Sequence, residues 1–482
     1  MSIKEKSIKG FFWLSSAKIF SQLILWFFST FTARLLNPED YGRMALSLFF
    51  ILLFSFINEL GLGSAIVQWK NFTLEELHSC FWFMFFMNIG MYLLAFFAAY
   101  PIGSFFQDRT LIPIIQILAL TFILNAIRAV PYSLLRRELE FKVVAKCQLV
   151  PSLLSAPLVF VCAFSGFGVW SLIIGYMFQN ILFVFLIFYY FPWKPQLWFS
   201  FKKIKGMLRF GVSVNTAKFL TFLSGQSDTL IIGKILGAES LGFYNVAFMI
   251  GIVPIEKISE IIYHISFSTF SQLQDNQAKL MTYFKKANRY IALTTFPAIA
   301  GIFLVADSLI PIVLGEKWVP IVVPLKILCG VGILRAVAVT MIPLLHARGK
   351  ADSVLKYSLI SGIVMPLAFL IGTRFGIMGV AVAWGIVYPF LVAYLVFLCL
   401  RELNLSLYEY VRNVTPAITS TLFMVLLIGL FQSTIFRGNI YIHLVGSVMV
   451  GILSFSGFLY FTNREFVIEF KNIVHILRQK QA

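Results

Sequence analysis

Charged side chains interrupt several long apolar segments of this sequence. The basic ones are Lys18, Arg128, Lys218, Lys257, Lys326 and Arg335, and the acidic ones are Glu59, Asp228, Glu256 and Glu260. A charge inside a membrane is costly unless it faces a hydrated cavity or a partner, so such residues are candidates for function. Because the basic residues outnumber the carboxylates, they favour an anionic substrate, and phosphate groups are natural ligands of arginine and lysine.

Two of these residues, Lys18 and Lys218, belong to an internal repeat. A shift of 200 residues places Lys18 on Lys218 and also aligns their surroundings. The matching pairs are 15–18 with 215–218, 33–36 with 233–236, Glu39 with Glu239 and Gly42 with Gly242. Gln22 shares a helix face with Lys18, as Asn215 does with Lys218. A weaker match places 167–168 on 375–376 at a shift of 208.

These patterns define two sets of candidate site residues. The candidate substrate-binding residues are Lys18, Gln22, Arg128, Asn215, Lys218 and Arg335, and the candidate coupling or gating residues are Asp228, Glu256 and Glu260. The two glutamates, together with Lys257, form either part of an inner gate or a self-contained ion-pair cluster. Asp228 is either an acidic switch that pairs with a cavity cation after the substrate has left, or one half of a static ion pair with Arg34 or Lys234.

No catalytic or metal-binding pattern accompanies these residues. The five histidines are scattered singly, without metal-ligand spacing or a carboxylate partner at a fixed offset. No glycine-rich phosphate loop with its lysine appears, and the five cysteines lie in or beside apolar runs, which is typical of small core residues. We therefore expect no enzyme activity, no metal and no cofactor.

The elements that carry these charges are predicted to be membrane helices. Of the 482 residues, 59% are hydrophobic and 12% charged, with a mean hydropathy of +0.87, whereas a soluble domain has about 25% charged residues. This composition excludes a soluble enzyme and leaves no polar stretch long enough for a nucleic-acid-binding module. At about 20 residues for each crossing, we expect an all-α integral membrane protein with about 14 transmembrane helices. Their expected ranges are 11–34, 43–67, 80–103, 111–134, 148–165, 169–191, 208–235, 242–265, 289–312, 320–345, 354–373, 376–400, 415–436 and 440–462.

The lysines and arginines give this layout an orientation. Most of the 39 fall on the same side of the membrane as the N-terminus, and such residues are retained on the cytoplasmic side. Both termini are therefore expected in the cytoplasm. The net charge of +18 also predicts contact with anionic lipid headgroups.

The repeat predicts the domain organisation. An even number of spans separates the two copies, so both enter the membrane from the same side and form a parallel repeat. We expect a six-helix bundle over 1–200, its repeat over 201–400, and two additional transmembrane helices with a cytoplasmic tail over 401–482. Two such bundles are typical of alternating-access transporters, in which the substrate binds between the halves.

Four segments resemble a known protein family. They are 33–42 (ARLLNPEDYG), 59–65 (ELGLGSA), 136–141 (RRELEF) and 228–234 (DTLIIGK). The chain resembles the Wzx-type polysaccharide flippases of the multidrug/oligosaccharidyl-lipid/polysaccharide (MOP) exporter superfamily over about residues 1–400. The segment 136–141 resembles the corresponding sequence in the branch of that family that includes WzxC and TuaB.

This resemblance implies a substrate and a place in the cell. The implied substrate is an undecaprenyl-diphosphate-linked oligosaccharide, which is moved from the inner to the outer leaflet of the bacterial cytoplasmic membrane for surface lipopolysaccharide or exopolysaccharide. The implied cationic cavity lies between the two halves, at Lys18, Arg128, Lys218 and Arg335. Membrane lipids and other polysaccharide assembly proteins are the expected partners.

Two other functions stay open at this point. A multidrug-type ion-coupled antiporter of the same fold would bind cations and so favour buried carboxylates over basic residues. A membrane glycan polymerase would carry a sizeable external loop for its acceptor, and the longest predicted external turn is short. Both patterns differ from the one in this sequence.

Overall fold

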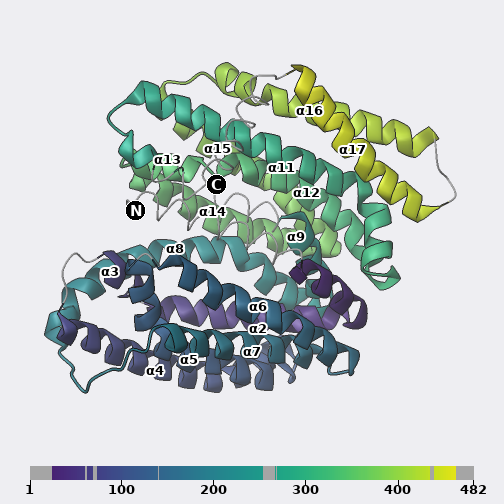
Figure 1. Cartoon of the computed structure of the whole chain (residues 1–482). Coiled ribbons are helices and arrows are strands. Elements are labelled where there is room, and N and C mark those ends of the chain that lie inside the picture. Colours follow the sequence, from purple (N-terminus) through teal and green to yellow (C-terminus); the bar gives the residue numbers. More distant parts are fainter. Residues whose placement is uncertain are drawn as a thin grey trace, which may run out of the picture. The chain divides into compact units, whose positions relative to one another are not determined.

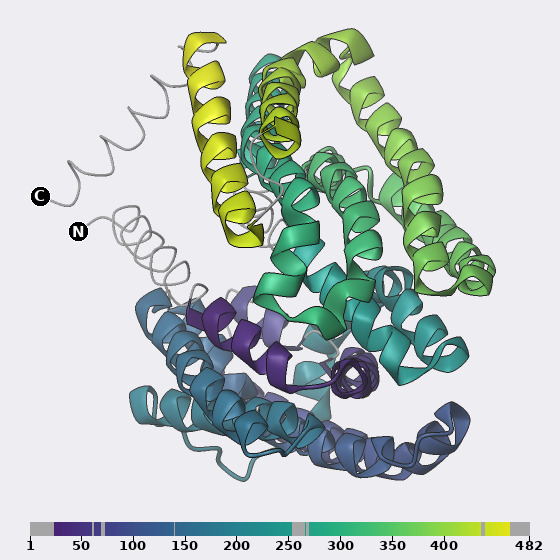
Figure 2. The same cartoon turned by 90° about the vertical axis from the view of Figure 1, so that its right-hand side faces the viewer.

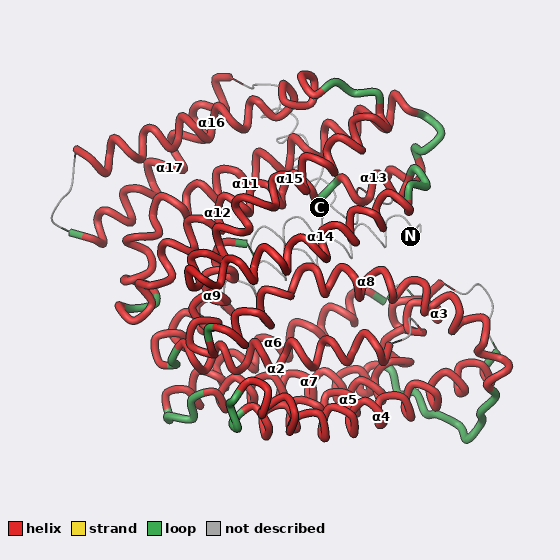
Figure 3. The backbone as a smooth tube through the Cα atoms, turned by 180° about the vertical axis from the view of Figure 1, so that it is seen from behind, coloured by secondary structure: helices red, strands yellow, loops and turns green. Residues whose placement is uncertain are grey.

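The computed structural model of the chain describes residues 24–59, 62–68, 73–138, 140–252, 266, 269–434 and 439–462. Every regular element among these residues is a helix, and no strand occurs in them (Figures 1 and 3). The predicted all-α fold is therefore confirmed for the described part of the chain.

Many of these helices have the dimensions of membrane spans. Within the described residues, nine helical runs are long and apolar enough to cross a membrane. One of them, Asp352–Leu403, has 52 residues, more than twice the about 20 that one crossing needs. The total of 14 spans stays a prediction, because most of the first expected span and much of the eighth lie outside the described residues.

The chain divides into two compact units, Met1–Asn245 and Val246–Ala482. The described helices of unit 1 are Ile24–Leu35, α2 (Pro38–Glu59), α3 (Leu62–Gln68), α4 (Leu74–Phe106), α5 (Leu111–Arg137), α6 (Phe141–Phe164), α7 (Val169–Tyr190) and α8 (Phe201–Ile235). The helix α9 (Gly237–Gly251) begins in unit 1 and ends in unit 2. The described helices of unit 2 are α11 (Gln277–Val313), η1 (Glu316–Ile321), α12 (Val322–Ala338), α13 (Met341–Ala347), α14 (Ala351–Gly372), η2 (Thr373–Phe375), α15 (Gly376–Leu403), α16 (Leu407–Thr434) and α17 (Ile440–Thr462).

The two units pack their helices in the same order. In unit 1, α4 packs on α5, α5 on α7, and α6 on α7; in unit 2, α11 packs on α12, α12 on α15, and α14 on α15. This agreement is what an internal repeat produces. The helices α16 and α17 lie side by side (Figure 2) and pack on α11, and their status as an addition to the repeat stays a prediction. The helix α8 packs on α2, α3 and α4 and therefore belongs to unit 1, although it begins after residue 200. The repeat boundary at residue 200 stays a prediction.

Several helices are longer than their apolar spans. The helix α11 begins at Gln277, well before the expected residue 289, because the Asn276 side chain accepts a hydrogen bond from the Lys279 amide at 3.0 Å and so caps its first turn. The polar turns that follow continue the helix beyond the apolar part. Sequence hydropathy detects only the apolar part, so the expected boundaries were too short here.

One expected span is interrupted. The range 320–345 contains α12 and α13, with turn residues at 339–340 between them. Pro343 explains the break, because it has no amide hydrogen to donate to the carbonyl of Val339 and its ring crowds that carbonyl.

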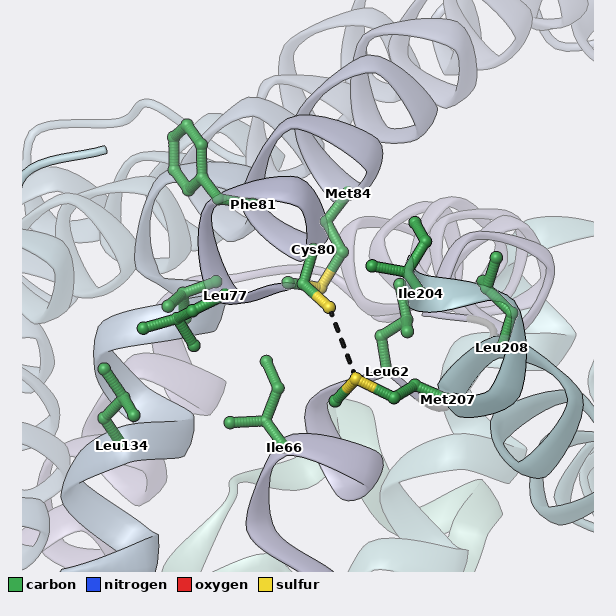
Figure 4. Close-up of a cluster of buried hydrophobic side chains, with 11 residues drawn as sticks. Leu62, Ile66, Leu77, Cys80, Phe81, Met84, Leu134, Ile204, Met207 and Leu208 are labelled. Carbon is green, nitrogen blue, oxygen red and sulfur yellow. Dashed lines mark hydrogen bonds between the residues drawn. The ribbon is translucent and has the colours of Figure 1, made fainter. Parts of the chain in front are cut away.

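A cluster of buried side chains joins one end of α4 to α3 and α8 within unit 1 (Figure 4). Leu62, Ile66 and Met84 are among its members, and the Cys80 Sγ lies 3.9 Å from the Met207 Sδ. These apolar contacts hold the beginning of α8 in place. The interpretation of Cys80 as a small core residue is consistent with this position.

The beginnings of α2 and α9 cross with their backbones in contact, within unit 1. A Cβ added to Gly42 would lie 1.7 Å from the Ala238 carbonyl oxygen, and one added to Gly242 would lie 1.7 Å from the Pro38 carbonyl oxygen. The 200-residue shift takes Gly42 to Gly242 and Pro38 to Ala238, so the two contacts are equivalent within the internal repeat. Only glycine permits this approach at the two positions.

Candidate functional site

The first arginine candidate lies in unit 1. Arg128 is on α5, and its Nη1 donates a hydrogen bond to Asn180 Oδ1 on α7 at 3.3 Å. Its Cζ lies 4.5 Å from the centre of the Phe183 ring, also on α7. Tyr176, one turn before Asn180, is close enough for the charge of Arg128 to act on its hydroxyl. The guanidinium thus contacts Asn180 and Phe183, both on α7.

The second arginine candidate lies in unit 2. Arg335 is on α12, and its Cζ lies 4.6 Å from the ring of Trp384 and 6.0 Å from that of Tyr388, both on α15. The ring of Phe248, on α9, is 5.0 Å from the same atom. Tyr357 on α14 forms a hydrogen bond with Tyr388. Aromatic faces therefore surround this guanidinium.

The two arginines occupy equivalent places in their units. Both α7 and α15 start at a glycine with positive φ, 54° at Gly168 and 65° at Gly376, and these glycines are the pair aligned by the 208-residue shift. The same shift takes Tyr176 to Trp384 and Asn180 to Tyr388, and a shift of 207 takes Arg128 to Arg335. Each arginine therefore contacts its equivalent helix at the same matched position, Asn180 on α7 and Tyr388 on α15.

The carboxylate candidate Asp228 is buried in α8, with 2% of its surface exposed. Its Oδ2 accepts a hydrogen bond from the Tyr244 hydroxyl at 2.6 Å, and its Oδ1 accepts one from the Thr229 amide at 2.8 Å. Lys234, one of the expected ion-pair partners, lies instead against Phe105, with its Nζ 4.2 Å from the ring centre. Asp228, on α8, and Arg128, on α5, belong to the same unit.

The remaining candidates are not placed by the structure. Lys18, Gln22, Glu256 and Glu260 lie outside the described residues. Asn215 and Lys218 belong to α8, but their side chains also lie outside the part that the structure describes. Their assigned roles stay predictions.

Another intramembrane lysine differs from the two arginines. Lys326 on α12 forms an ion pair with Asp307 on α11, with 2.5 Å between Nζ and Oδ2. The Asp307 side chain is 65% exposed, so this pair lies at the surface of unit 2 and not in its interior. Within the described residues, no group of three or more histidine, cysteine, aspartate or glutamate side chains is arranged to hold a metal ion.

The sequence did not single out the partners of the arginines. Asn180 interrupts the apolar run of α7, and a polar residue at that depth was a signal that could have been used. Trp384 and Phe183 carried no such signal, because 17% of the chain is aromatic and most of those residues face lipid or core. Tyr244 was also missed, since nothing in the sequence relates it to Asp228.

These observations define the class of protein. The described helices form a multi-pass membrane fold whose packing is repeated in two units, an organisation that is common among membrane transporters. The family model described as "Polysaccharide biosynthesis protein" matches residues 31–323. Because this match covers more than half of the chain, the protein belongs to that family.

Individual relatives agree with this assignment. The chain is 29% identical over 395 residues to the lipopolysaccharide biosynthesis protein WzxC of Escherichia coli (strain K12). This match covers 80% of the present chain and 79% of WzxC. Among solved structures, the lipid II flippase MurJ in an inward closed conformation matches with a TM-score of 0.74 and 17% identity, covering 95% of this chain and 100% of MurJ. An inward-facing MATE multidrug resistance transporter of the MOP superfamily matches with a TM-score of 0.55 and 14% identity, covering 86% and 96%. The resemblance to polysaccharide biosynthesis proteins such as WzxC is thus confirmed, and the structural matches show a shared fold.

Proposed function

We propose that this protein is a flippase that moves an undecaprenyl-diphosphate-linked oligosaccharide from the cytoplasmic to the outer leaflet of the bacterial inner membrane. It acts by alternating access and without catalysing a chemical reaction. The observation that carries the proposal is the pair of equivalent arginines, Arg128 and Arg335. A diphosphate inside a bilayer lacks counter-ions, and a guanidinium supplies both the charge and a planar set of donors that matches phosphate oxygens.

The two units would share the work of binding in this proposal. Each half, 1–200 and 201–400, contributes one arginine site, and the lysines Lys18 and Lys218 add positive charge to the same path. The segment 401–482 is an addition to the transporting halves. The similarity to WzxC and to the fold of MurJ supports a lipid-linked sugar as the substrate class.

The proposed orientation places both termini in the cytoplasm. It rests on the asymmetric distribution of lysine and arginine, which also favours contact with anionic lipids. The partners are then the lipid-linked substrate, the surrounding lipids and other proteins of polysaccharide assembly. A multidrug antiporter of the same fold is less well supported, because an organic cation would be repelled by Arg128 and Arg335.

Native mass spectrometry tests the proposal on protein purified from a strain that makes surface polysaccharide. The wild type should retain a ligand with the mass of undecaprenyl diphosphate plus sugars. The variants Arg128→Gln and Arg335→Gln should lose most of it. Lys326→Gln is the matched control, since it removes a positive charge from α12 that already pairs with Asp307, and it should retain the ligand. Equal retention by all three variants, or a cationic ligand in the wild type, would contradict the proposal.

A further inference from the structure

Aromatic rings lie against the guanidinium groups of both arginines. The distance from Cζ to the ring centre is 4.5 Å for Arg128 over Phe183 and 4.6 Å for Arg335 over Trp384. Both are within the about 6 Å over which a cation and an aromatic face attract each other. An aromatic ring attracts the guanidinium charge through its π face and does not take the place of a phosphate oxygen as hydrogen-bond acceptor.

We infer that Trp384 and Phe183 are positioning residues, which set the plane of each guanidinium so that its N–H edge is aimed at the substrate diphosphate. This inference rests on the proposed function. Two-pronged binding of a phosphate requires the N–H groups and the phosphate oxygens to lie in one plane. An arginine side chain has several rotatable bonds, and a ring close to the guanidinium restricts the orientations that its plane can adopt.

The two sites have diverged around this shared arrangement. In unit 1, α7 supplies a ring and an amide oxygen, from Phe183 and Asn180. In unit 2, α15 supplies two rings, from Trp384 and Tyr388. Tryptophan is the strongest cation-binding ring, so the effect of removing one ring is best measured at Trp384.

The experiment measures binding of undecaprenyl diphosphate to the purified full chain in detergent. Trp384→Leu keeps an apolar side chain but removes the ring, and it should weaken binding about 2- to 30-fold. Trp384→Phe retains a ring and should restore most of the affinity. Phe369→Leu is the matched control. The Phe369 ring, on the neighbouring helix α14, packs on Trp384 with 5.2 Å between the ring centres. The variant therefore disturbs local packing without removing the Trp384 ring from Arg335.

A double-mutant cycle separates positioning from general packing. If Trp384 acts through Arg335, the substitution Trp384→Leu should have little further effect in an Arg335→Gln background. The inference is overturned if Trp384→Leu and Trp384→Phe weaken binding equally, or if the loss persists in that background. If Trp384→Leu fails to fold, the same comparison is made in unit 1. Phe183→Leu removes the ring beside Arg128 and should weaken binding, whereas Phe183→Tyr retains a ring and should not.

The same data distinguish this inference from the proposed function. If the wild type does not bind undecaprenyl diphosphate, or if Arg335→Gln binds it as tightly as the wild type, the proposed function itself fails at this site. If Arg335→Gln weakens binding while the two Trp384 variants behave alike, only the positioning role fails.

Discussion

Substituting alanine for Gly42 should destabilise the protein, because two backbones meet at this position. The added Cβ would lie 1.7 Å from the Ala238 carbonyl oxygen, whereas an ordinary contact begins at 3.4 Å, so α2 and α9 would have to separate by about 1.7 Å. A flexible side chain could rotate away, but a carbonyl of a helix cannot. Overpacking of this kind costs about 1–3 kcal/mol or more.

The matched control is the same substitution at Gly90, on α4. No atom lies within 4 Å of a Cβ added there. Replacing an unhindered helical glycine with alanine stabilises a protein by about 0.4–1 kcal/mol, because the unfolded chain loses conformational freedom. The two identical substitutions should therefore have effects of opposite sign, and their free energies of unfolding should differ by about 1.5–4 kcal/mol.

The assay is thermal unfolding of the purified protein in one detergent, followed by the loss of the monodisperse peak in size-exclusion chromatography. Gly42→Ala and Gly242→Ala should each lower the midpoint, and Gly90→Ala should hold or raise it. The double variant at 42 and 242 should lose less than the sum of the two single losses, because the first substitution already separates the helices. A Gly42→Ala protein as stable as the Gly90→Ala protein would refute the backbone contact.

Three further predictions concern orientation, the buried carboxylate and pH. A single cysteine at Glu239 should react with a membrane-impermeant reagent added outside intact cells, whereas one at Lys350 should not, and the reverse pattern would invert the proposed topology. Asp228→Asn should slow transport while substrate remains bound. Normal export by Asp228→Asn between pH 6 and 8 would exclude a switch role. Burial raises the pKa of Asp108, but hydrogen bonds from Thr110 and from the Arg43 guanidinium lower it by more, so the folded pKa is below the usual value. The stability that this carboxylate contributes should therefore be fully present above about pH 4 and should disappear as the pH falls through the folded pKa. An Asp108→Asn protein should unfold at a lower temperature than the wild type at pH 7, and the two proteins should unfold at the same temperature at the lowest pH.

Much of the fold could be predicted from the sequence because membrane helices must be long and apolar. The glycine turns at Gly168 and Gly376 mark the start of equivalent helices, and these two residues already align in the sequence at a fixed shift. The packing of α8 within unit 1 could not be predicted, because hydropathy reports burial in lipid or protein but not which helix is the neighbour.

The candidate site was less accessible to sequence reasoning. Arg128 and Arg335 stand out as charges within apolar runs, since the cost of burying them demands an explanation. Their equivalence did not stand out, because the second half contains additional residues that change the shift from 200 to about 207. The ring over each arginine could not be selected among 53 phenylalanines, 18 tyrosines and 9 tryptophans without the geometry of α7 and α15.

The central claim is tested most directly by reconstituting the purified protein in liposomes with a fluorescent undecaprenyl-diphosphate-linked oligosaccharide. A membrane-impermeant reductant added outside bleaches only the label in the outer leaflet. Liposomes with the wild type should lose well over half of the fluorescence as the inner pool becomes accessible, whereas the combined Arg128→Gln and Arg335→Gln variant should stop near half, as protein-free liposomes do. Loss by the double variant to the same extent and at the same rate as the wild type, or no loss beyond half with the wild type, would contradict transport of this substrate through the two arginine sites.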